Sequence, residues 1–178
     1  MKIIILFFLL VIAVTQDIHS GRVPNKLILC GLLFGLICKI QEYEVRGIYL
    51  YLRNISVPVI LFYLLFLMHV LGAGDIKLFS MIGGILTIEE LFLCIWYSFI
   101  VGGVLSLLYL LKDKYGWKKL KYAWSYLLCL CKEQKIVAYE LPEEIPKSKM
   151  AFSIAIFLGW MGVICIPLIQ SGGLFWFS

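Results

Sequence analysis

The sequence has little charge, and the polar residues that a soluble surface would need are scarce. Of its 178 residues, 15% are charged and 62% are hydrophobic, with a mean hydropathy of +0.98. A soluble domain of this size has no interior large enough for so much apolar side chain. The apolar runs are continuous rather than alternating, which argues against a lipid-facing β-barrel. We therefore predict an all-α polytopic membrane protein, with residues 1–178 forming one membrane-embedded domain.

Histidine is almost absent, and the six cysteines include no CxxC pair. Only two histidines are present, and Cys129 and Cys131 form a CxC rather than a zinc-ribbon motif. These features favour neither a metal site nor a disulfide framework, so the cysteines are interpreted as small apolar fillers. The net charge of +5 is not carried by a recognisable basic module, so no nucleic-acid partner is expected.

Six apolar runs predict about six transmembrane helices, because a helix needs about 20 apolar residues to cross a bilayer. Their approximate spans are 2–18, 26–40, 54–71, 75–88, 90–111 and 150–169. The first run also resembles a secretory signal peptide. We favour a span there, since no small-x-small cleavage site follows it and cleavage would sever Asp17 from the other helices.

The distribution of basic residues predicts the orientation of these spans. The only sizeable polar insertion covers residues 112–149 and holds nine lysines. With this insertion, Arg22, Lys26 and Lys77 inside, twelve basic residues face the cytoplasm and four face outward. The positive-inside rule favours this arrangement, which places Asp17 and Asp75 at the cytoplasmic ends of their helices.

These two aspartates are the main candidates for function. Asp17 closes the first apolar run, and Asp75 lies between two others. Burying an ionised group at membrane depth costs several kcal/mol unless its pKa changes, so such groups are found mainly at functional sites. Two carboxyls at a similar depth are the minimum catalytic groups of an aspartic protease, in which the pair shares one proton.

Glycines precede the second aspartate. Gly72 and Gly74 would let the backbone turn sharply and let an extended substrate chain approach Asp75. Lys77, two residues further on, could balance the negative charge of the pair or could extend to the headgroups.

Other residues near the first aspartate have structural alternatives. Asp17 could face interfacial water or pair with Arg22, and Pro24 followed by Asn25 predicts a helix start, with Asn25 available as its N-cap. His19 is interpreted as a solvated loop residue, and His69 as a packing residue in an apolar run.

Both motifs resemble those of the type IV prepilin peptidases. The run from Asp17 to Asn25 is similar to the first motif of that family, and residues 72–78 match its second motif, GxGDxK. A weaker similarity is Pro146 followed by an apolar run to Gly159. The resemblance implies six membrane helices, two essential aspartates, and removal of the leader from prepilins, pseudopilins or preflagellins.

The long bacterial members of that family have a cytoplasmic N-terminal region with CxxC pairs, and many also methylate the pilin. This sequence resembles the short form, so methyltransferase activity is not expected. No metal, nucleotide or covalent enzyme intermediate is implied. Two alternatives stay open from the residues alone: a small ion-coupled transporter and a non-catalytic assembly subunit, each of which could also keep intramembrane aspartates.

Overall fold

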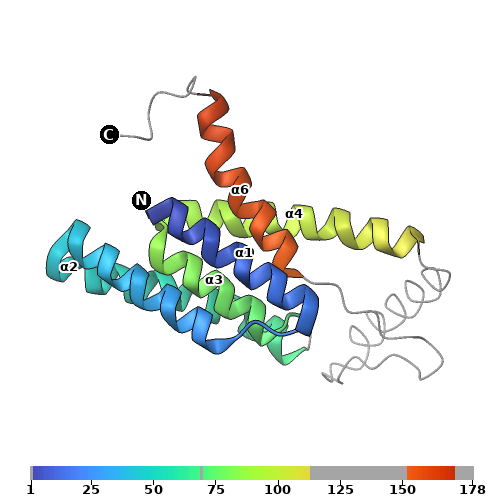
Figure 1. Cartoon of the computed structure of the whole chain (residues 1–178), viewed down its shortest axis with the longest axis horizontal. Helices are drawn as coiled ribbons and strands as arrows, with labels where there is room; N and C mark the ends of the chain where they lie inside the picture. Colours follow the sequence, from blue (N-terminus) through green and yellow to red (C-terminus); the bar gives the residue numbers. More distant parts are fainter. Residues whose placement is uncertain (1, 69, 113–151, 171–178) are drawn as a thin grey trace.

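Helices make up the framework of the molecule. The computed structural model describes residues 2–68, 70–112 and 152–170. Within these ranges the regular elements are α1 (Lys2–Ser20), α2 (Asn25–Leu67), α3 (Ala73–Ile85), α4 (Ile88–Lys112) and α6 (Phe152–Gln170) (Figure 1). The predicted all-α class is confirmed. Apart from Lys112, the predicted insertion at 112–149 lies outside the described residues.

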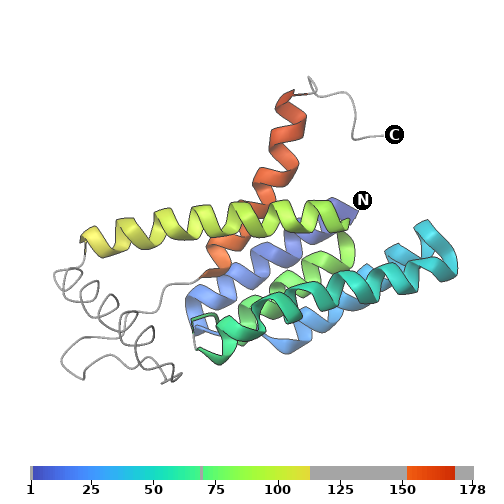
Figure 2. The same cartoon turned by 180° about the vertical axis from the view of Figure 1, so that it is seen from behind.

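Helix α2 contains a sharp reversal that the sequence did not predict in this form. Residues 41–53 were expected to connect two spans, but they are helical on both sides of Glu44. Glu44 has φ 51° and ψ −135°, which no helix accommodates. The chain doubles back there, so α2 consists of two arms lying side by side (Figure 1 and Figure 2). The Tyr51 hydroxyl joins the arms by donating to the Leu32 carbonyl oxygen at 2.9 Å.

Helix α3 lies at the centre and contacts each of the other four helices. Its last eight residues, 78–85, are all buried. The outer surface carries exposed apolar side chains such as Phe8, Leu29, Ile60 and Leu111, which suits contact with lipid rather than water. By length and composition, α1, α2 and α4 could each cross a membrane. The 13 residues of α3 extend only about 20 Å, less than the hydrocarbon thickness of about 30 Å.

A capping box defines the start of α4, and close packing holds α6 against α4. Thr87 and Glu90 form a capping box: the Glu90 carboxylate accepts from the backbone N–H of Thr87 at 2.8 Å, and the Glu90 N–H donates to the Thr87 hydroxyl at 3.3 Å. Further along, Gly159 of α6 presses so closely on Ser98 of α4 that a Cβ would lie 2.6 Å from the Ser98 nitrogen. The two helices are therefore held in one register.

Candidate active site

Asp17 lies in the last turn of α1, and the end of that helix is defined by a glycine. Gly21 has φ +65°, a conformation that costs other L-residues energy, and its N–H donates to the Asp17 carbonyl oxygen at 2.8 Å. This αL cap stops the helix one turn after Asp17. The aspartate is half-buried as a result, at a helix end rather than in the middle of the apolar run.

Asp75 lies in the first turn of α3, after Gly72 in the capping position. Gly72 has φ −76°, which any residue can adopt, so the expected role of glycine in a sharp turn is wrong here. The presence of glycine at position 72 is better explained by the limited space there, because a Cβ on Gly72 would lie 3.2 Å from Asp75 Oδ2. Gly74 is less confined, with Val23 at 3.8 Å from a Cβ placed there.

The two aspartates come together at one end of the helix bundle. The C-terminal end of α1 and the N-terminal ends of α3 and α6 meet there, and α4 ends on the same side (Figure 1 and Figure 2). Asp75 belongs to none of the three helices long enough to cross a membrane. Its pKa is raised to about 6, mainly because burial disfavours the charged form and also because Asp17 lies close enough to repel that charge. A hydrogen bond from the Gly72 backbone opposes this effect without cancelling it.

A serine that the sequence did not single out completes the cluster. The Ser153 hydroxyl, in the first turn of α6, donates to Asp17 Oδ2 at 2.6 Å. Ser153 is 1% exposed, so this bond is shielded from solvent. The predicted alternative partner of Asp17 was Arg22, but the one ion pair among the described residues joins Lys2 to Glu42.

Lys77 and Asn25 contact one another, which the sequence did not predict. Pro24 occupies the capping position of α2, and Asn25 is the first helical residue, so the predicted N-cap role of Asn25 is wrong. Its side-chain oxygen instead accepts a hydrogen bond from the Lys77 ammonium at 2.9 Å. This contact links the two motifs, although Lys77 makes no ion pair with either aspartate in the ranges that the structure covers.

One of the two histidines, His19, lies in the described part of the chain. His19 is exposed and belongs to the last turn of α1 rather than to a loop. His69 lies outside the described residues. In the part of the chain that the structure describes, no three His, Cys, Asp or Glu side chains gather as they would around a metal ion.

Residues 4–107 match the model of the Type IV leader peptidase family, which is more than half of the chain. The chain belongs to this family. The match includes both aspartates and ends before α6. No curated protein and no solved structure matches the chain significantly. The family resemblance seen in the sequence is thus confirmed, and the protein is a peptidase of the membrane.

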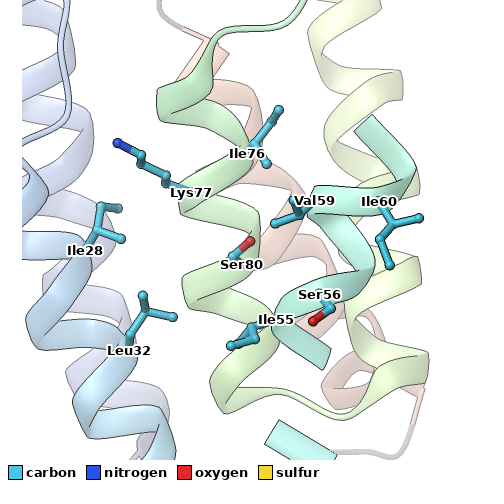
Figure 3. A pocket seen from close by; sticks show the side chains of 9 residues that line it. All are labelled: Ile28, Leu32, Ile55, Ser56, Val59, Ile60, Ile76, Lys77 and Ser80. Carbon is cyan, nitrogen blue, oxygen red and sulfur yellow. The ribbon is translucent and has the colours of Figure 1, made fainter. Parts of the chain in front are cut away.

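The peptidase also has an apolar cavity of about 450 Å³ beside α3. Figure 3 shows it between the two arms of α2, with Lys77 and Ser80 of α3 among its lining residues. Residues on a helix are separated by 100° each, so Ile76 and Ser80 face more than a quarter turn away from Asp75. The cavity therefore belongs to a different face of α3 from the one that carries Asp75.

Proposed function

We propose that this protein is an aspartic endopeptidase with Asp17 and Asp75 as its catalytic pair. It removes the short basic leader from prepilin-like, pseudopilin-like or preflagellin-like proteins. The observation that carries the proposal is the meeting of these two carboxyls, 58 positions apart in the sequence, at one end of the bundle. Perturbed carboxyls placed beside one another are typical of catalytic sites.

The chemistry follows from two carboxyls that share one proton. The raised pKa of Asp75 supports assigning the shared proton to Asp75. Asp17 takes a proton from a bound water, whose oxygen attacks the scissile carbonyl carbon, while Asp75 gives its proton to the carbonyl oxygen. Collapse of this intermediate breaks the C–N bond. The proton held by Asp17 passes to the leaving amine, and Asp75 takes back a proton from one hydroxyl of the intermediate, whose oxygen becomes the new carbonyl oxygen. The residues imply no cofactor.

The location of the site supports the cytoplasmic face of the plasma membrane of a bacterium or archaeon. Arg22, Lys26 and Lys77 lie in the turn or the helix starts at the end of the bundle that carries the aspartates, and α4 ends with Lys112 on the same side, as the positive-inside rule requires of the cytoplasmic side. A site there would meet a substrate whose apolar helix is in the bilayer and whose leader is in the cytoplasm. We extend this to one multi-pass domain over residues 1–178, with its insertion at 112–149 on the same side.

Co-expression with a small membrane protein that has a basic leader, a glycine and then an apolar helix tests the proposal. Loss of the leader is read as a mass shift. Asp17→Asn and Asp75→Asn should each lower cleavage by a factor of about 10² to 10⁴, because an amide cannot cycle a proton. Both variants should insert in the membrane at normal levels.

His19→Gln is the matched control, because His19 lies two residues from Asp17 in the same helix turn and is exposed. It should cleave nearly as well as the unchanged protein. Full cleavage by either Asp→Asn variant at equal membrane level would rule out the two-aspartate mechanism.

A further inference from the structure

Ser153 joins the last helix to the first aspartate. Its hydroxyl donates to Asp17 Oδ2 at 2.6 Å, across 136 positions of sequence. It is one of five buried polar or charged residues among the described residues, and the only one of them that contacts an aspartate. A buried hydroxyl bonded to one carboxylate oxygen fixes the rotamer of that carboxylate and leaves the other oxygen available.

Asp17 occupies a helix end that is unfavourable for a negative charge. Asp17 lies in the last turn of α1, where the carbonyl ends of the helix disfavour a negative charge. Asp75, by contrast, lies in the first turn of α3, which favours one. The helix ends alone would therefore place the charge on Asp75, and a charge-assisted bond from Ser153 acts in the opposite direction.

The packing of α6 holds this donor in place. The ring of Phe152, next to Ser153, packs against Phe99 of α4 with the ring centroids 5.8 Å apart. Gly102 makes room for the same ring, because a Cβ there would lie 2.5 Å from Phe152 Cε2. Two helix turns further along, Gly159 packs against Ser98. The serine is thus carried by a rigid helix pair rather than by a loop.

We propose that Ser153 is a positioning residue for Asp17, whose hydroxyl holds Oδ2, favours the ionised carboxylate and leaves Oδ1 to activate the water. This role rests on the proposed function, in which Asp17 is catalytic. It places a residue of α6, beyond the region matched by the family model, in the support of the active site.

The test is the pH dependence of kcat/KM for Ser153→Ala, measured on the purified protein in detergent with a peptide that has a basic leader, a glycine and an apolar segment. The acid limb should move to higher pH, because the carboxylate of Asp17 loses a hydrogen-bond donor. We expect kcat to fall about tenfold with little change in KM, since the carboxylate is less well placed. The position of the limb does not depend on how much of the protein is folded.

Two further variants separate positioning from packing. Ser98→Ala makes the same change at another buried serine, whose hydroxyl bonds to the Cys94 carbonyl oxygen, and its acid limb should stay in place. Ser153→Thr keeps the hydroxyl, and its acid limb should stay close to that of the unchanged protein.

An acid limb that stays in place in Ser153→Ala, or moves equally in Ser98→Ala, overturns the role of Ser153. A shift confined to the alkaline limb overturns it as well, because Asp17 would then be the proton donor. These results are distinct from failure of the proposed function, in which Asp17→Asn and Asp75→Asn would still cleave the same peptide.

Discussion

The two ends of the helix bundle differ in the interactions that their charged side chains make. At the end where α2 reverses, charged and polar groups have complementary partners: Lys2 pairs with Glu42, Glu90 caps α4, and the buried Lys39 lies over the ring of Tyr43 at 5.6 Å from its centroid. At the other end, two carboxyls lie near one another, and within the described residues neither makes an ion pair. Complementary pairs stabilise a fold, whereas like charges held together cost energy and are retained for chemistry.

The strongest way to sharpen this comparison is to move a carboxyl by one methylene at each end. Asp17→Glu or Asp75→Glu displaces the reacting oxygens by about an ångström, which should lower cleavage about a hundredfold. Glu90→Asp at the opposite end weakens a helix cap and should cost about 0.5–2 kcal/mol of stability while cleavage continues. Leader loss by mass and thermal unfolding of the same preparations give both quantities.

Equal loss of cleavage in Glu90→Asp and in the aspartate variants, at matched membrane levels, would remove the functional distinction between the two ends.

The second prediction concerns pH and the stability of the site end. Between its ordinary pKa of 3.8 and about 6, folded Asp75 keeps a proton that the unfolded chain has lost. Stability from this group is thus complete below pH 3.8 and falls as the pH rises towards 6. Asp75→Asn removes this dependence. Across that window the Tm of the unchanged protein in detergent should fall by a few °C relative to the variant.

Parallel Tm curves for the two proteins would mean that Asp75 ionises as easily in the folded protein as in the unfolded chain.

The smallest effect is expected where the ion pair is complementary but exposed. Lys2 and Glu42 have side chains that are 41% and 35% exposed, so the pair should contribute less than about 1 kcal/mol. Glu42→Gln should lower the free energy of unfolding by no more than this and leave cleavage within about twofold. A double-mutant cycle with Lys2→Met measures the coupling energy between the two side chains. A coupling energy of several kcal/mol would contradict the small contribution expected of this exposed ion pair.

The sequence predicted the helices and singled out the two aspartates as candidates for function, because both depend on local signals. Apolar runs of helix length gave the approximate positions of α1, α4 and α6, and an aspartate next to such a run is conspicuous in a chain with so little charge. The number of membrane crossings stays a prediction. The reversal at Glu44 was missed in detail, because a single residue of unusual φ leaves no trace in hydropathy.

Ser153 was missed for a different reason. A serine in an apolar helix is common and has no meaning until the three-dimensional structure shows what it touches. The one local signal was its place near the start of the last apolar run, inside the segment after Pro146 that resembles the family. The contact of Lys77 with Asn25 was likewise out of reach, since both residues had plausible local roles.

The contact between α6 and Asp17 also has a consequence for the timing of biosynthesis. A ribosome adds about 5–20 residues per second, so the roughly 80 residues from Asp75 to Ser153 take about 4 to 16 seconds to make. During this interval the growing chain already has both aspartates but lacks the helix that contacts the first of them. The geometry around Asp17 is therefore completed only when α6 has been synthesised.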